Sequence, residues 1–316
     1  MIGVCIVTYN QEAFIAKALD SVLEQKECPE IIRIYIGNDC STDHTAEICE
    51  EYVKKHPETI KLINNKDNLG LVKNTVNVLK IILSDGCDYV AMLDGDDYWC
   101  DPFKLKKQIG FLSENQNYGL VHTHSYLLTD NSLKKSHLPS PPVGDVFSEM
   151  GKFSIANCTV VFRSCLLRHI NFEEFTSKGL YSADYIMYVI FSAKTLFGFI
   201  SDHTAVWRRD ITSVSNPKNE SKQIDYLNND KAVQMYLAEL FPDRFSFNED
   251  SWQSFYFYRV FNIAFNYQDY SLAHATGPKL YNHKNGFFFR IKLLCATNKL
   301  FFFVWGQLKR ISSILK

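Results

Sequence analysis

The sequence predicts an α/β fold in which helices flank a mostly parallel sheet, followed by a helical C-terminal extension. Short apolar runs alternate with amphipathic segments of helical period over residues 2–127, an order typical of parallel strands joined by right-handed crossovers. The connections between these segments are short. The chain has 316 residues, and 46% of them are hydrophobic, which suffices for a sizeable core.

The first strand is expected at residues 2–8, where a continuous apolar run is typical of a strand covered on both faces. Residues 12–24 are expected to form a helix because their apolar positions recur with helical spacing. The other elements of this half follow the same two patterns. Strands are expected at 31–37, 60–63, 88–93 and 120–127, and helices at 41–55, 71–83 and 102–112.

The second half of the chain is less regular. Residues 138–144 contain three prolines and a glycine, which excludes a helix or a central strand there. Residues 210–229 are polar and rich in turn-forming residues, so we expect a hinge or a mobile loop. The other expected elements are an apolar run at 158–162 and helices at 182–196, 231–240 and 252–267.

We therefore expect two domains, an α/β domain at 1–215 and a helical extension at 216–316. The formal net charge of −1 gives no case for a nucleic-acid-binding protein. Residues 270–316, however, carry eight Lys and Arg and no acid, which indicates that this end meets something anionic.

Cysteine usage and hydropathy suggest where the protein works. The nine cysteines are scattered without a C-x-x-C pair, and the chain starts directly in a strand-like run, which favours a reducing cytoplasm and no secretion. No charge-free stretch reaches the length of about 18 residues that a transmembrane helix needs, so a conventional transmembrane helix is not expected.

Three carboxylates, in Asp94-Gly95-Asp96-Asp97, directly follow the apolar run 89–93. Packed at the end of a buried strand they would repel one another unless a cation lies between them. Mg²⁺ or Mn²⁺ is the natural candidate because hard ions prefer carboxylate oxygen and bind beside substrate phosphates. Ligands of parallel sheets bind beyond the carboxyl ends of strands, where Thr8-Tyr9-Asn10 and Asp39 are also expected. The pattern predicts one site, with a solvated acidic turn as the alternative.

Six motifs, in this order, resemble those of glycosyltransferase family 2, the inverting enzymes with the Rossmann-like GT-A fold. The resemblance covers roughly residues 1–215. The motifs are Val7-Thr8-Tyr9-Asn10, Asn38-Asp39-Cys40-Ser41-Thr42-Asp43, Asn68-Leu69-Gly70, Leu93-Asp94-Gly95-Asp96-Asp97, Ser182-Ala183-Asp184-Tyr185 and Ala205-Val206-Trp207-Arg208-Arg209.

The resemblance implies a nucleotide-sugar donor and assigns residues to it. Thr8, Tyr9 and Asp39 would hold the base and ribose, since Tyr9 offers a stacking face and Asp39 can accept from a uracil N–H. Asp94 would face the ribose hydroxyls and Asp96 would bind the metal through the diphosphate. Asp97 is a second metal ligand or a residue that orients the cluster. Further donor contacts are expected from Asn10, Asn68, Gly70, Lys73 and Gly95, with a solvated helix face as the alternative for Lys73.

Inversion needs a base that takes the proton of the attacking sugar hydroxyl, and the resemblance implies Asp184 for this role. The alternative is that Asp184 merely caps the helix that begins near Tyr185.

Two departures from the family pattern stand out. Asp210 occupies a position where a metal-binding histidine is common, and Asn74-Thr75-Val76 replace a usual A-R-N. His122 and His124 share a strand face that borders the acceptor cleft or is partly buried.

The aromatic and basic segment 286–316 resembles an interfacial helix on an anionic membrane, with Lys292, Lys299, Lys309, Arg310 and Lys316 in one arc. A helix packed on the domain or on another subunit is the alternative.

We expect an enzyme that moves a hexose or N-acetylhexosamine from a UDP-sugar to a glycan or lipid-linked glycan in bacterial surface polysaccharide synthesis, at the cytoplasmic face of the inner membrane. The alternatives are an inactive nucleotide-sugar-binding or scaffold protein and a nucleotidyltransferase on a related fold.

Overall fold

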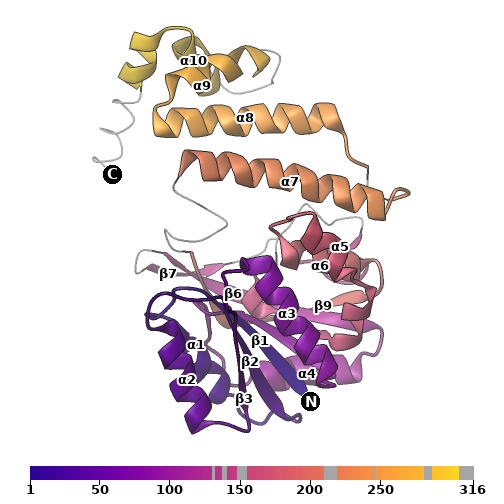
Figure 1. Ribbon diagram of the computed structural model, residues 1–316. Coiled ribbons are helices and arrows are strands. Elements are labelled where there is room, and N and C mark those ends of the chain that lie inside the picture. Colours follow the sequence, from indigo (N-terminus) through magenta and orange to yellow (C-terminus); the bar gives the residue numbers. More distant parts are fainter. Residues whose placement is uncertain are drawn as a thin grey trace. The chain divides into compact units, whose positions relative to one another are not determined.

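The chain folds into two compact units, Met1–Asp210 and Ile211–Lys316, in a computed structural model (Figure 1). The predicted boundary lay at 215/216. The structure describes residues 1–129, 132–136, 141–147, 155–209, 219–244, 246–280 and 287–305. The predicted loop residues 210–218 and the basic residues Lys309, Arg310 and Lys316 lie outside these ranges.

One mixed sheet forms the frame of the first unit, and in the described residues its strand order is β3-β2-β1-β4-β8-β6-β9-β5, with β7 beside β6. Strands β1 to β4 pair in parallel, and Val7 of β1 lies beside Asp94 of β4. Strands β5, β7 and β8 join antiparallel. The strands are β1 (Ile2–Thr8), β2 (Ile32–Asn38), β3 (Ile60–Asn64), β4 (Tyr89–Asp94), β5 (Tyr98–Trp99), β6 (Tyr118–Thr129), β7 (Ser132–Ser136), β8 (Val161–Arg163) and β9 (Leu196–Arg208).

Helices cover this sheet and close its core. The four helices of the first half are α1 (Ile15–Leu23), α2 (Thr45–Lys55), α3 (Leu71–Ser84) and α4 (Lys104–Glu114). The apolar positions that predicted the first helix, among them Ile15, Ala18 and Leu19, are fully buried in the same core cluster as Val4 and Ile6 of β1. The predicted parallel, helix-flanked sheet is therefore confirmed for the first half of the chain.

The second half of this unit departs from the prediction. The helix expected at 182–196 is α6 (Ala183–Ser192), and it is preceded by the short α5 (Phe172–Ser177). Leu196 already belongs to β9, a strand that the sequence did not predict. Parallel pairing with the long β6 stabilises β9, which includes polar residues such as Asp202 and His203 that conceal its strand character.

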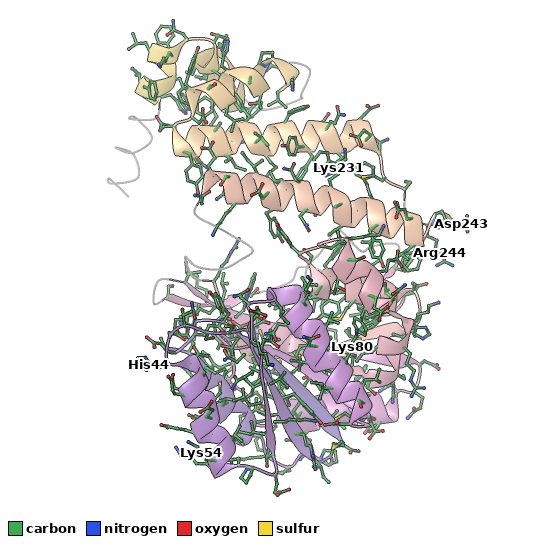
Figure 2. The ribbon with its side chains drawn as sticks, viewed as in Figure 1. His44, Lys54, Lys80, Lys231, Asp243 and Arg244 are labelled. Carbon is green, nitrogen blue, oxygen red and sulfur yellow. The ribbon has the colours of Figure 1, made fainter. Side chains whose placement is uncertain are left out.

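The second unit is helical, with α7 (Glu220–Leu240), α8 (Glu249–Tyr267), α9 (Tyr270–Thr276) and α10 (Phe287–Ala296). Helix α7 begins well before the predicted residue 231, because the Asn219 side chain caps it by accepting from the Lys222 N–H. Residues 220–229, predicted as loop, are thus helical. Lys231 of α7, labelled in Figure 2, donates to Glu249 at 2.7 Å and lies 5.1 Å from the Trp252 ring centroid, which ties α7 to α8.

The predicted basic arc required one continuous helix in the C-terminal segment, and the structure does not have one. Helix α10 ends at Ala296, and a second helical segment runs from Lys299 to Trp305. Asn298 caps this segment by accepting from the Leu300 N–H at 2.9 Å. Lys292 turns toward α8 and donates to Asn262, so it does not share an outward face with Lys299. None of the helices in the described ranges is long and apolar enough to span a membrane.

Candidate active site

The carboxylate cluster begins where β4 ends beside β1. The Gly95 N–H donates to the Val7 carbonyl at 3.0 Å. A Cβ at Gly95 would lie 2.4 Å from Gln11 Oε1 and 2.9 Å from Thr8 Cβ, so the lack of a side chain allows this close approach. The structure therefore brings together two predicted donor residues, Thr8 and Gly95, at the carboxyl ends of adjacent parallel strands.

Gly95→Ala is expected to lower the free energy of unfolding by about 1–3 kcal/mol, because the added methyl group must displace Gln11 and the end of β1. Urea denaturation measures this. Gly110→Ala is the matched control, since no described atom lies within 4 Å of a Cβ there and alanine favours the helix α4. Equal stability of wild type and Gly95→Ala would contradict the close approach.

Asp94, at the end of β4, is held by two residues from elsewhere in the chain. Asn157 Nδ2 donates to both Asp94 oxygens, at 3.2 and 3.3 Å, and the Tyr188 hydroxyl donates to Asn157 Oδ1 at 2.7 Å. Burial, together with the charges of Asp96 and Asp184, raises the pKa of Asp94 to about 7. Because the charge of Asp184 acts on Asp94, these two carboxylates lie in one region of the molecule.

Asp184 lies in the first turn of α6, where its carboxylate accepts from its own N–H and from that of Tyr185. The N-cap residue of α6 is Ser182, so Asp184 is not the cap that the alternative expected, although it accepts from N–H groups of the first turn. Burial nevertheless raises the pKa of Asp184, and a carboxylate with a raised pKa is a better proton acceptor. These first-turn contacts are compatible with a role of the same side chain in proton transfer.

Asp97 points into the protein. Its side chain is 2% exposed, Oδ1 accepts from the Arg208 N–H at 2.7 Å, and the Cys158 thiol also hydrogen-bonds to it. Arg208 comes from the predicted 205–209 motif, which β5 joins to the cluster by pairing Tyr98 with Val206. The Arg208 guanidinium in turn donates to the Asp96 carbonyl at 3.0 Å. Of the two predicted roles of Asp97, these contacts favour orientation of the cluster.

The carboxylates of Asp94 and Asp96 fit a divalent cation if the substrate supplies the other ligands. Within the described ranges no group of three or more His, Cys, Asp or Glu could hold a metal. Asp94 and Asp96 nevertheless offer neighbouring carboxylates whose repulsion raises the pKa of Asp94, and a hard cation would relieve that repulsion. Asp210, the predicted substitute for a histidine ligand, lies outside the described residues.

The residues after β1 form the other side of this edge. The Tyr9 ring is 45% exposed and free to offer a stacking face, whereas the buried Thr8 hydroxyl donates to Gln11 at 2.7 Å. Asn10 has a left-handed φ of 52° and accepts from the Thr42 N–H at 2.7 Å. This bond holds the turn after β1 against the turn after β2.

Asp39 is buried, and it binds the backbone of the motif Asn68-Leu69-Gly70. Its oxygens accept from the N–H groups of Leu69 and Gly70, at 2.9 and 2.8 Å, and from Asn65 Nδ2 at 2.9 Å. Asn68 also accepts from Gly70, whose φ of +82° favours glycine. The structure thus brings Asp39, Asn68 and Gly70 together. A contact of Asp39 with a nucleobase stays a prediction.

Two other predicted features differ in their surroundings. Lys73 is exposed on α3, one turn after Gly70, and its role at the donor stays a prediction. His122 is fully buried, contacts the Pro142 carbonyl at 2.9 Å and packs on Phe199, as does His124. Burial lowers the pKa of His122 to about 4. The buried alternative for these histidines is therefore correct for His122.

Sequence reasoning missed three contributors to the site. Asn157 and Tyr188 lie in segments without a recognisable motif, and no sequence signal marks them. Asn74 was noted only as a departure from A-R-N. It is buried and links α3 to β2, since its Nδ2 donates to the Gly37 carbonyl at 2.7 Å and its Oδ1 accepts from Asn65. Asn74 therefore supports the residue that holds Asp39.

Comparison with known proteins gives a family match. The model of Glycosyl transferase family 2 matches residues 3–169. The uncharacterized protein Rv1520 of Mycobacterium tuberculosis is 33% identical over 134 residues, which are 42% of this chain and 37% of Rv1520. The dTDP-rhamnosyl transferase RfbG of Shigella flexneri is 35% identical over 111 residues, 35% of this chain and 37% of RfbG. The chain thus spans little more than a third of the length of these relatives.

Solved structures share the fold at low sequence identity. TarS 1-349 of S. aureus in complex with UDP-GlcNAc is 16% identical, with a TM-score of 0.53 over 93% of this chain and 79% of that one. The mannosyltransferase PcManGT of Pyrobaculum calidifontis in complex with GDP-Man and Mn²⁺ is 14% identical, with a TM-score of 0.55 over 98% of this chain and 86% of that one. The sheet and its helices therefore have the GT-A arrangement.

Proposed function

The chain belongs to glycosyl transferase family 2, and from this premise we propose that it transfers a sugar from a nucleotide-sugar donor to a glycan acceptor with inversion. One observation carries the proposal. Asp94 at the end of β4 and Asp184 on α6 are far apart in sequence, but the Asn157 amide and the Tyr188 hydroxyl link their two elements, and the charge of Asp184 raises the pKa of Asp94. One carboxylate serves the donor and the other the acceptor.

The chain's own residues would perform the following work. Asp184 takes the proton of the acceptor hydroxyl as that oxygen attacks the anomeric carbon from the side opposite the diphosphate. Asp94 holds the ribose, Tyr9 stacks on the base, and Asp97 with Arg208 keeps the cluster in position. Asp96, with Asp94, would hold Mn²⁺ or Mg²⁺, and such an ion supplies charge neutralisation for the departing diphosphate.

For the donor we propose a UDP-sugar of the hexose or N-acetylhexosamine type. Support comes from the fold shared with TarS, which binds UDP-GlcNAc, while the GDP-Man complex of PcManGT and the dTDP-rhamnosyl activity of RfbG define the competing donors. Calorimetric titration of the full chain with UDP, GDP and dTDP, each with Mn²⁺ or EDTA, tests this. UDP is expected to bind most tightly and only with metal, and preferential binding of GDP or dTDP would overturn the assignment.

For the acceptor we propose a lipid-linked glycan reached at an anionic, cytoplasmic membrane surface. All nine cysteines are free, which agrees with a reducing compartment. The C-terminal apolar patch, defined as Leu294, Leu300, Phe301 and Val304, has side chains 48–70% exposed. It lies in the region of the chain that carries basic residues and no acid. Apolar burial and attraction to anionic headgroups would act together there.

Phe301→Asp is expected to weaken binding of the full chain to phosphatidylglycerol vesicles by about tenfold or more, because a buried phenylalanine contributes about 1.5–3 kcal/mol. Vesicle sedimentation measures the bound fraction, with neutral phosphatidylcholine vesicles expected to bind little. Leu133→Asp, at a side chain that is 52% exposed on β7, is the matched control and should bind like wild type. Equal binding of the Phe301 variant would contradict the membrane proposal.

A further inference from the structure

The orientation of the Asn157 amide is set by its two partners. When the Asp94 carboxylate is ionised, as binding of a cation beside it requires, it can only accept hydrogen bonds, so the amide turns its NH₂ group toward Asp94. Its Oδ1 then faces the Tyr188 hydroxyl, which must donate, and the structure has this arrangement at 2.7 Å. A flipped amide would set an oxygen against the carboxylate oxygens. The Tyr188 hydroxyl therefore holds the amide in the orientation that Asp94 needs.

The two partners join different parts of the site. Asn157 opens the short 3-10 helix Asn157–Thr159, and the neighbouring Cys158 hydrogen-bonds to Asp97 through its thiol. Tyr188 is 3% exposed on α6, and it lies four residues after Asp184, on the same helix face. The chain of contacts Asp94–Asn157–Tyr188 thus runs from the strand that carries the donor carboxylates to the helix that carries the proposed base.

We propose that Asn157 and Tyr188 are positioning residues that fix the Asp94 carboxylate for the nucleotide donor and tie it to the helix of Asp184. The inference rests on the proposed function, since Asp94 serves the donor only there. Neither residue touches the reacting atoms in this account. Tyr188 acts on the donor only through Asn157, and this order of action is what an experiment can test.

A double-mutant cycle on the full chain, with UDP and Mn²⁺ as the probe in calorimetry, tests the link. Asn157→Ala is expected to weaken UDP binding about tenfold or more, because it removes two hydrogen bonds to a charged carboxylate. Tyr188→Phe is expected to weaken it about three- to tenfold, because the amide can then flip. In the Asn157→Ala background, Tyr188→Phe should add nothing, which is the signature of residues that act in series.

Tyr35→Phe is the matched control. Tyr35 is also fully buried in the same sheet and its hydroxyl donates to a carboxylate, that of Asp85, at 3.0 Å, away from the site. It should bind UDP like wild type, which separates a local effect from general loss of a buried hydroxyl.

The outcomes separate the link from the proposed function. If wild type binds UDP and Tyr188→Phe binds it equally well, the link is wrong while the donor site stands. Additive losses in the double variant would also overturn the link, because Tyr188 would then act by another route. If wild type binds none of UDP, GDP and dTDP with Mn²⁺, the proposed function fails, and the inference fails with it.

Discussion

Asp184→Asn is expected to lower kcat for sugar transfer by about 100- to 10,000-fold while UDP binding stays within about twofold of wild type. Asparagine has the shape of aspartate but cannot take a proton. The carboxylate lies on α6 and not on β4 with the donor carboxylates, so donor binding should survive. Steady-state kinetics of UDP release, with and without acceptor, measures the effect.

The same substitution separates the two readings of Asp184. Asparagine caps helices about as well as aspartate, so a residue that only caps α6 would tolerate the change in both stability and kcat. Glu173→Gln is the matched control, since Glu173 is also an acid in the first turn of a helix, α5. Full activity of Asp184→Asn would exclude Asp184 as the base.

Asp96→Ala is expected to reduce metal-dependent release of UDP from the donor by about 1,000-fold, which corresponds to about 4 kcal/mol of transition-state stabilisation. The reason is that Asp96 is the proposed ligand that couples the cation to the diphosphate. Activity of the variant should no longer rise with added Mn²⁺, and EDTA should reduce wild type to the level of the variant.

Asp202→Ala serves as the control for Asp96→Ala. Asp202 is an exposed carboxylate of β9 that pairs with Lys107 at 2.5 Å, so its loss removes a negative charge without touching the cluster. An Asp96 variant that keeps wild-type response to Mn²⁺ would show that the cation, if any, binds elsewhere.

Much of the fold follows from local patterns, because the parallel strands of the first half appear as short apolar runs and the helices as segments of helical period. The helical pattern is clear where only one face of a helix is buried, as in α1. It fails where tertiary contacts override composition. Lys104 looks like a surface residue of α4, yet it is fully buried against Gln108 and lies 4.4 Å from the Trp99 ring centroid. Its desolvation lowers its pKa to about 7.

Some residues of the candidate site could be predicted from the sequence and others could not. The carboxylates were found because several acids at the end of a buried strand are costly and therefore informative. Asn157 gave no such signal, since a single asparagine in an irregular segment is common. Its role depends on two partners, Asp94 and Tyr188, that only the folded chain brings to it. The hydrogen bond from the Arg208 N–H to Asp97 likewise depends on the pairing of β5 with β9.

The central claim is that the edge formed by Asp94, Asp96 and Asp184 transfers sugar from a nucleotide donor. Its most direct test is a screen of UDP-, GDP- and dTDP-sugars for nucleotide release by wild type, Asp96→Ala and Asp184→Asn, with Mn²⁺, Mg²⁺ or EDTA, paired with calorimetry of the free nucleotides. We expect metal-dependent release from one UDP-sugar, lost with EDTA and in the Asp96 variant. No release from any donor together with no binding of any nucleotide would contradict the claim.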